Sequence, residues 1–305
     1  NAMIRRDSYL GIEEKDILKR ERLRHLCNHN MYVACAKAIA SCHQIDPEAK
    51  IAPVMAYSPT YPKDSKPENI LAAKKSEDLY RNYMIDVHCR GEYPAYYLRW
   101  LRDNGWDFPI SDEEHEILKA GKPDFYAFNY YRSSCAEYCP EDVSPELVER
   151  YRVDAKRRML PGICRHIDNP NIEPFPMNQW RLDPIGLRVA FRNIYERCHL
   201  PLMLCENGLG VPDILTNDFK IHDDYRIDYL KSHIIAMKEA VKDGIPVIGY
   251  HVWTFMDVIS TSEGFKKRYG LVYVNRDEKG GDLNRYKKDS FNWYREIIKE
   301  NGRNL

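Results

Sequence analysis

The chain has 305 residues, and its 46 lysines and arginines balance 46 aspartates and glutamates, so the formal net charge is zero. This balance gives no bulk electrostatic attraction to nucleic acid or to a membrane, and we expect neither as a partner. Nine cysteines without framework spacing indicate a reducing compartment, so we expect a cytoplasmic protein. No Cys/His group has zinc spacing, and we expect no metal and no cofactor.

Hydrophobic residues make up 44% of the chain, which is enough for a sizeable core. Asn1 and Ala2 before Met3 are typical of the remnant of a cleaved expression tag, so we expect the native chain to begin at Met3. No apolar segment approaches membrane-spanning length, and no signal peptide is evident. Without an internal repeat or a low-complexity linker, residues 3–305 are expected to form a single domain.

Helical and strand-like segments alternate along the chain. In chain order, we expect a helix over residues 14–44, a strand over 51–57, helices over 67–88 and 94–104, a strand over 124–131, a polar irregular insertion over 133–178, a helix over 183–198, a strand over 201–205, a helix over 224–243, a strand over 246–253 and a closing helix over 288–301. This alternation predicts an α/β fold, with a parallel sheet covered by helices. Four strands could form a small open sheet or half of an eight-stranded barrel.

The carboxyl ends of the expected strands carry aromatic, amide and carboxylate side chains. Chemistry in parallel-sheet proteins gathers at these ends, and this mixture suits a polar ligand with apolar faces, such as a sugar. The segment PLMLCENGLG (residues 201–210) is the most informative, because an apolar strand delivers Glu206 and then breaks at glycine. A carboxylate there is costly unless it is used. The alternative is an Asn-Gly turn after a core strand, with Glu206 merely solvated.

Five motifs in order resemble glycoside hydrolase family 1, and specifically its 6-phospho-β-glucosidase branch. The motifs are DFYAFNYYRS from Asp124, QWRLDPIGLR from Gln179, LCENGLG from Leu204, DDYRIDYLKSHI from Asp223 and GYHVWTFMDVISTSEGFKKRYGLVYV from Gly249. Each is weak alone, but five in the correct order and spacing are specific. The resemblance covers the chain from about Leu26 onward. It implies a (β/α)₈ TIM barrel, of which this chain would supply strands 5–8 and their helices.

The resemblance implies roles for the residues at the strand ends. Glu206 would be the nucleophile of a retaining glycosidase, which requires an ionised carboxylate at the anomeric carbon. Tyr131 would hold that carboxylate by a hydrogen bond, so we expect the two to be adjacent at the carboxyl ends, together with Trp253. Trp253 would lie against the sugar, and Trp180 would form the aglycone platform. For each of the two tryptophans, the alternative is packing in the core. For Tyr130 we expect core packing and no role at the site.

Asn129 falls on the family asparagine near the catalytic pair, although a turn asparagine is an alternative.

The last motif also implies the substrate. Ser260 stands where ordinary β-glucosidases of the family carry a glutamate, and a glutamate would repel a phosphate dianion. Lys267 and Tyr269 fall on the lysine and tyrosine that complete the 6-phosphate site. Without the family resemblance, the sequence around Lys267 would be interpreted as a solvated basic turn. The small Thr261 favours the gluco configuration.

A retaining glycosidase needs a second carboxyl group roughly 5–5.5 Å from the first. The family's asparagine–glutamate motif for this acid/base residue is absent, so we expect it to lie outside this chain. The leading hypothesis is a truncated 6-phospho-β-glucosidase whose substrate is a phosphorylated β-glucoside and which associates with itself or with a missing N-terminal half-barrel. The alternative is a catalytically inactive remnant that binds a phospho-sugar or a partner chain. A Schiff-base aldolase would need a lysine at a strand end, and no expected strand end carries one.

Overall fold

A computed structural model describes residues 11–153, 158–261 and 263–305. The expected tag remnant at Asn1 and Ala2 lies outside these residues. The helices are α2 (Ile17–Ile45), α3 (Pro67–Glu77), the π-helix η1 (Asp78–Asn82), α4 (Tyr83–Arg90), α5 (Ala95–Asp103), α6 (Asp112–Ala120), α7 (Pro145–Val153), α8 (Pro184–Cys198), α9 (Asp224–Lys242) and α10 (Asp289–Lys299). The strands are β1 (Val54–Ala56), β2 (Thr60–Pro62), β3 (Tyr126–Asn129), β4 (Ser134–Glu137), β5 (Met159–Leu160), β6 (Cys164–Ile167), β7 (Leu202–Asn207), β8 (Val247–Val252), β9 (Val272–Val274) and β10 (Arg285–Lys287).

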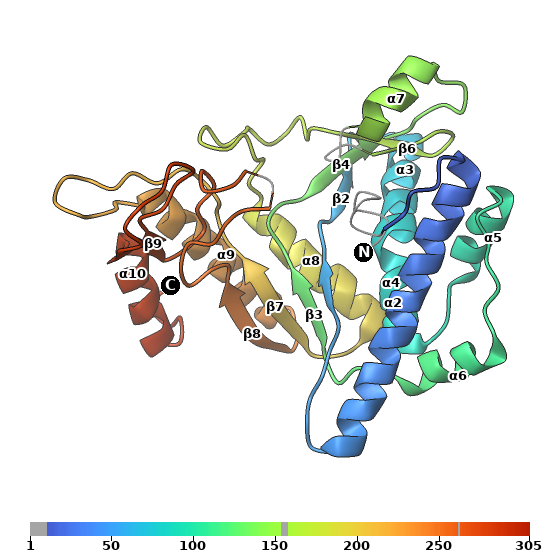
Figure 1. Cartoon of the computed structure of the whole chain (residues 1–305), viewed down its shortest axis with the longest axis horizontal. Helices are drawn as coiled ribbons and strands as arrows, with labels where there is room; N and C mark the ends of the chain where they lie inside the picture. The colour runs from blue at the N-terminus through green and yellow to red at the C-terminus, as the bar shows by residue number, and fades with distance from the viewer. Residues whose placement is uncertain (1–10, 154–157, 262) are drawn as a thin grey trace.

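The central sheet confirms the expected parallel arrangement. Its four strands lie in the order β1-β3-β7-β8, and every neighbouring pair is parallel. The strands are short apolar runs, and in β3 the first three residues are almost completely buried. Helices α8 and α9 pack against each other behind β3 and β7 (Figure 1). All four carboxyl ends therefore meet at one edge of the sheet, as the sequence predicts.

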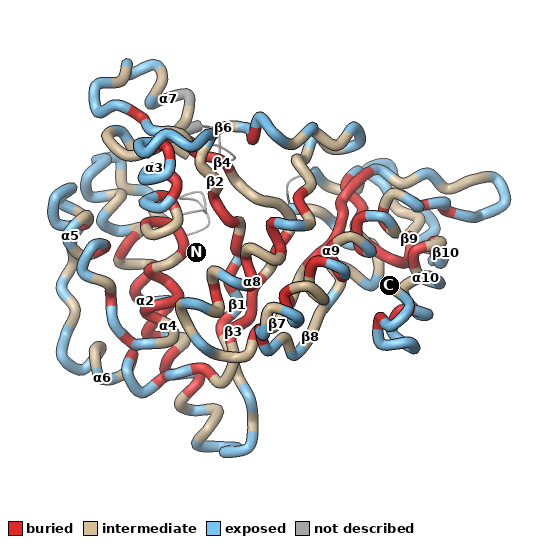
Figure 2. Tube along the Cα trace, turned by 180° about the vertical axis from the view of Figure 1, so that it is seen from behind, coloured by how far each residue is buried: buried red, intermediate tan, exposed pale blue. Residues whose placement is uncertain are grey.

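The main core lies between this sheet, helix α8 and the helices of the N-terminal half. Buried segments gather where α2, α4 and α8 approach the strands (Figure 2). Several polar groups in this core pair with one another. Asn28 of α2 donates to the Tyr83 hydroxyl at 2.5 Å, and the rings of Tyr83 and Tyr97 stack at 3.8 Å. The long helix α2 is thus bound to the rest of the fold by aromatic packing that carries hydrogen bonds.

The expectation of an irregular insertion over residues 133–178 is wrong. This segment contains β4, α7, β5 and β6, and with β2 the strands form a second sheet in the order β2-β4-β6-β5. Strand β2 follows β1 closely and β4 follows β3, so the second sheet stands beyond the carboxyl ends of the first (Figure 1). Each of these strands is only two to four residues long and lies in a polar segment. Such short strands show no clear alternation of apolar and polar residues, so the sequence does not predict them.

Smaller differences concern helix boundaries and elements that were not expected. The helix expected over 67–88 is divided by the π-turn η1, and α6 was not expected at all. Helix α6 begins with a capping box in which Ser111 and Glu114 bind each other's backbone amides. That pair is a recognisable sequence signal. The antiparallel pair β9–β10 was also not expected.

Candidate active site

Glu206 and Tyr131 meet at the carboxyl edge of the central sheet. Glu206 lies near the end of β7, and Tyr131 lies two residues beyond β3. The Tyr131 hydroxyl donates to Glu206 Oε2 at 2.6 Å, so the expected adjacency is present. Burial, together with this bond to the carboxylate, raises the pKa of Tyr131 well above its ordinary value. The phenol therefore stays protonated and acts as a permanent donor to the carboxylate.

The residue after Glu206 fixes the end of β7. Asn207 is completely buried, and its Nδ2 donates to the Tyr130 carbonyl at 2.7 Å and to the Tyr229 hydroxyl at 3.0 Å. Its Oδ1 accepts from the Tyr250 hydroxyl at 2.6 Å. This one side chain therefore joins the ends of β3, β7 and β8 and the helix α9. The expectation that Tyr130 packs in the core agrees with its complete burial and its bond to the Asp183 carbonyl.

The glycines after Asn207 allow close approach of neighbouring groups. A Cβ on Gly208 would collide with the Trp253 carbonyl, and a Cβ on Gly210 would collide with the Tyr269 ring. Neither glycine has a positive φ, so their small size matters here more than the turn conformation that the sequence suggested. The Asn-Gly pair therefore brings the strand-8 loop against the Glu206 strand.

Three neighbouring aromatic rings connect the Glu206 carboxylate, through Tyr131, to a buried lysine. The ring centroids of Tyr131 and Trp180 are 6.0 Å apart, and those of Tyr131 and Tyr269 are 6.1 Å apart. Lys267 Nζ lies 4.5 Å from the Trp180 ring and 5.9 Å from the Tyr269 ring. A desolvated ammonium is stabilised beside aromatic faces. Four of the residues singled out from distant motifs thus form one site with Glu206.

Lys267 differs from a residue of a solvated basic turn. It is only 6% exposed, whereas the neighbouring Lys266 lies on the surface. Its ammonium pairs with the Glu263 carboxylate at 2.9 Å, and that carboxylate is half exposed. Ser260 lies in the turn of the same loop, where its backbone pairs with Gly264 and its Oγ accepts from the Glu263 amide at 3.4 Å. An incoming anion would exchange with Glu263 as the partner of Lys267.

The remaining residues expected at the site also lie at strand ends. Trp253 follows β8 directly, and its amide donates to the Asn207 carbonyl at 2.9 Å. Asn129 ends β3 and is the parallel neighbour of Glu206 in the sheet register. Its Oδ1 is buried and has no hydrogen-bond partner within the described ranges. A buried acceptor of this kind is suited to a ligand hydroxyl.

A buried ion network lies behind the site, and the sequence reasoning did not predict it. The Lys288 ammonium contacts the carboxylates of Asp213 and Asp257, and both of those pairs are almost completely buried. Asp257 also accepts from Arg268 at 3.0 Å and from the Gly270 amide at 2.9 Å. These bonds fix the backbone on both sides of Tyr269. Nothing local in the sequence marks Lys288.

The second half of the network holds the loop that follows β7. Arg226 of α9 pairs with Asp213 at 2.7 Å and with Asp223 at 2.9 Å, and its guanidinium also donates to the Leu209 carbonyl. Asp223 and Arg226 fall in the DDYR motif, which is the one sequence signal that could have pointed to the network. All three side chains are at most 1% exposed.

The described residues contain no group of three histidine, cysteine or acidic side chains arranged to hold a metal ion. In the same ranges, no helix combines the length and apolar character that a membrane crossing requires.

Comparisons with known proteins show the family of this chain. The family model of glycosyl hydrolase family 1 matches residues 8–303. The chain is 42% identical to the aryl-phospho-β-D-glucosidase BglC of Bacillus subtilis, over 91% of this chain and 59% of that protein. It is 38% identical to the 6-phospho-β-glucosidase AscB of Escherichia coli, over 93% of this chain and 57% of that protein.

Solved structures give the same picture. The fold is similar to the family 1 β-glucosidase from Thermotoga maritima, with a TM-score of 0.75 and 26% identity, covering 92% of this chain and 58% of that one. The chain thus spans less than three-fifths of the length of the relatives it matches.

The ion network yields a stability prediction. Lys288→Met leaves two buried carboxylates without their shared cation, and breaking a buried pair in this way costs about 3–5 kcal/mol. We expect urea denaturation to show this loss in the free energy of unfolding. The matched control is Lys299→Met, which removes an exposed lysine paired with Glu296 and should cost at most about 1 kcal/mol. Equal effects of the two substitutions would contradict the assigned importance of Lys288.

Proposed function

The chain belongs to glycosyl hydrolase family 1, and we propose that it supplies the nucleophile-bearing part of a 6-phospho-β-glucosidase. In this proposal residues 3–305 form one domain that provides strands 5–8 of a (β/α)₈ barrel and their helices. The observation that carries the proposal is the 2.6 Å bond from Tyr131 to Glu206 at the carboxyl edge of the parallel sheet. The names of the relatives, which are hydrolases of phosphorylated β-glucosides, support it.

We propose a retaining mechanism with Glu206 as the nucleophile. The carboxylate attacks the anomeric carbon, the bond from that carbon to the aglycone oxygen breaks, and a covalent glycosyl intermediate forms. Water then releases glucose 6-phosphate and regenerates the carboxylate. Tyr131 aims Glu206, because its hydroxyl donates to one carboxylate oxygen, Oε2, and Oε1 would be the oxygen that attacks. The second carboxyl group, which protonates the departing oxygen, would come from outside this chain.

We propose that the substrate phosphate binds Lys267, with Ser260 and Tyr269 as neutral donors. The burial of Lys267 beside two aromatic rings supports this role, since a poorly hydrated ammonium gains most from an anionic ligand. The Tyr269 pKa is raised by burial first and by nearby carboxylates, so its phenol remains a donor. Trp253 and Asn129 would contact the glucose ring, and Trp180 would support the aglycone.

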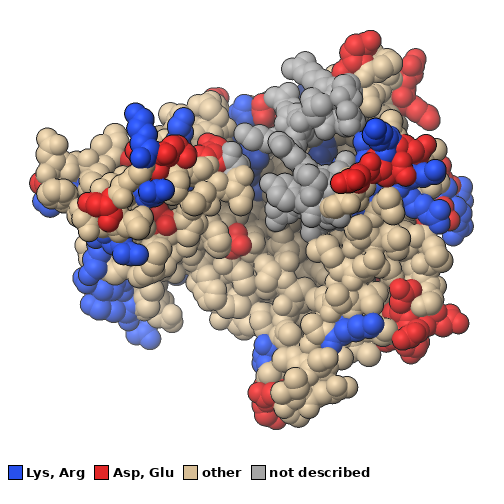
Figure 3. Space-filling view, viewed as in Figure 1, with Lys and Arg blue, Asp and Glu red and all other residues tan. Residues whose placement is uncertain are grey.

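We also propose that the protein associates with itself or with a missing half-barrel. Within the described residues, β1 and β8 each pair with one neighbour only, and Val54 and Ile248 on them are more than half exposed. The face of the molecule that carries this sheet is largely free of charged side chains around its centre (Figure 3). The nine free cysteines support our further proposal that the protein works in the reducing cytoplasm.

Self-association predicts a solution mass above that of one chain. Unpaired strand edges and exposed apolar side chains favour pairing with another copy. Light scattering of the pure protein should therefore give a multiple of 36.0 kDa that falls on dilution. A stable mass of one chain at high concentration would contradict the proposed association.

The phosphate site predicts selective binding of glucose 6-phosphate. Lys267→Ala should weaken this binding roughly 10- to 100-fold, because a hydrogen bond to a charged group contributes about 1.5–3 kcal/mol. The matched control is Lys266→Ala, which removes the exposed neighbouring lysine and should change affinity less than about threefold. Isothermal titration calorimetry with glucose and glucose 6-phosphate measures both effects. Equal affinity for the two sugars, or no change in Lys267→Ala, would contradict the phosphate assignment.

The nucleophile can be tested without the missing acid. We expect the isolated chain to hydrolyse aryl 6-phospho-β-glucosides negligibly, since general acid assistance typically contributes about 10²–10⁴-fold. Fluoride departs without a proton, so 2-deoxy-2-fluoro-6-phospho-β-glucosyl fluoride should still form the covalent intermediate. Mass spectrometry should find one sugar on the peptide that contains Glu206. Tyr131→Phe should label roughly 10- to 100-fold more slowly.

The control for this experiment is Glu206→Gln, which keeps the shape of the side chain and should abolish labelling. Labelling of Glu206→Gln at an unchanged rate would show that another group is the nucleophile. Binding of glucose 6-phosphate without any labelling of the unmodified chain would favour the catalytically inactive remnant instead.

A further inference from the structure

Two of the nine cysteines lie at one contact between helices, away from the candidate active site. Cys89 is in the last turn of α4, and Cys198 is the last residue of α8. The two helices lie side by side and pack directly against each other (Figure 1). Because Cys198 shortly precedes the start of β7, the pair lies at the opposite edge of the sheet from Glu206. None of the roles proposed above uses either thiol.

Charged side chains hold the two helices together beside these cysteines. Arg197 of α8 donates through Nη1 to Asp86 Oδ2 of α4 at 2.5 Å, and the Asp86 side chain is only 3% exposed. Arg90 of α4 donates through Nη2 to the Arg197 carbonyl at 3.4 Å. Arg90 directly follows Cys89, and Arg197 directly precedes Cys198. The bonds between these neighbours therefore keep the two cysteines at a fixed position relative to each other.

The two thiols contact each other and differ in acidity. A hydrogen bond from the Cys89 thiol to the Cys198 sulfur is the main reason why the pKa of Cys198 is lowered, and the Leu200 amide also donates to this sulfur. The same hydrogen bond raises the pKa of Cys89, and burial adds to this effect. The thiolate is the nucleophilic form of a cysteine. Cys198 is therefore the nucleophile of the pair, while Cys89 carries the proton.

A polar cleft follows the same contact between the helices. Its volume is about 690 Å³, and its walls include Asn82 and Arg90 on one side and Asn193 and Arg197 of α8 on the other. The two arginines are the chain neighbours of the cysteines. Both cysteine side chains are half-buried rather than enclosed, although they also pack against the main core. A reactive thiol must be accessible, and the cleft gives a small molecule an approach to this contact.

We propose that Cys89 and Cys198 form a redox-active pair, which a low-molecular-mass disulfide converts into an intrachain disulfide bond. The Cys198 thiolate attacks one sulfur of the small disulfide, so that a mixed disulfide forms and one thiolate departs. The Cys89 sulfur then attacks the Cys198 sulfur, and its proton passes to the second departing sulfur. Two protein thiols are oxidised, and one small disulfide is reduced to two thiols. This inference is independent of the proposed function.

Treatment of the reduced full-length chain with glutathione disulfide tests the proposal. Mass spectrometry of tryptic peptides, prepared without reductant, should find the peptide that contains Cys89 joined to the peptide that contains Cys198. Dithiothreitol should separate the two peptides. Because this readout uses the unmodified chain, it does not depend on the folding of any variant.

Single substitutions distinguish the roles of the two thiols. Cys89→Ser removes the second thiol, so the reaction should stop with one glutathione retained on Cys198. Cys198→Ser removes the nucleophile and should give neither the mixed disulfide nor the joined peptides. The matched control is Cys205→Ser, which removes another half-buried thiol from the same tryptic peptide as Cys198. This control should leave the joined product unchanged.

Urea denaturation provides a second readout. The oxidised chain should unfold at a higher urea concentration than the reduced chain, because a cross-link that closes a loop of roughly 100 residues restricts the unfolded state. Cys198→Ser should show no such shift after the same treatment. The proposal is overturned if the treated wild type lacks the Cys89–Cys198 link, if Cys89→Ser retains no glutathione on Cys198, or if oxidation lowers the urea midpoint.

Discussion

The buried pair of carboxylates around Lys288 is the constraint on which the site depends. A charge removed from water must be paired and hydrogen-bonded, so Asp213, Asp257 and Lys288 can be buried only together. Asp213 belongs to the loop after β7, and Asp257 to the loop after β8. One ammonium therefore holds the loops after β7 and β8, which carry candidate site residues, at a fixed separation.

The positions of the functional side chains follow from this constraint. Asp257 binds Arg268 and the Gly270 amide, and Tyr269 lies between these two residues, with Lys267 just before them. At the other loop, the Arg226 guanidinium binds the Leu209 carbonyl close to Glu206. The aromatic and cationic groups are thus oriented by a rigid, water-excluded base, while the loop end near Glu263 stays at the surface.

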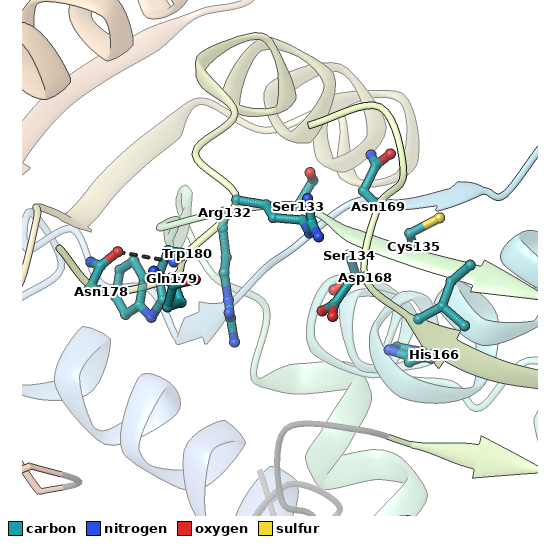
Figure 4. Close-up of a pocket in the computed structure, with 12 residues that line it drawn as sticks. Arg132, Ser133, Ser134, Cys135, His166, Asp168, Asn169, Asn178, Gln179 and Trp180 are labelled. Atoms are coloured by element: carbon teal, nitrogen blue, oxygen red, sulfur yellow. Dashed lines mark hydrogen bonds between the residues drawn. The ribbon is translucent and has the colours of Figure 1, made fainter. Parts of the chain in front are cut away.

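The second sheet gives the site its outer wall. Strands β4 and β6 are antiparallel and extend beyond the carboxyl end of β3, which places Arg132 and Asp168 on facing walls of one pocket. The central sheet therefore supplies Glu206, and the added strands line a pocket that shares Trp180 with the candidate site (Figure 4). This division matches the general pattern in which the sheet holds the reacting groups and the connections set specificity.

The sequence by itself determined the central strands, helices α8 and α9 and the position of Glu206 near a strand end, because these depend on local patterns such as the apolar run before Glu206. Motif order also identified Tyr131 and Lys267 as candidates. Only the tertiary structure decided the second sheet and the partners of Lys288. Lys288 and Asp213 are 75 residues apart, and the strands of the second sheet are too short to show a period. The local pattern of apolar and polar residues indicates which side chains are buried. The pairing between distant segments, in contrast, depends on the packing of the whole chain.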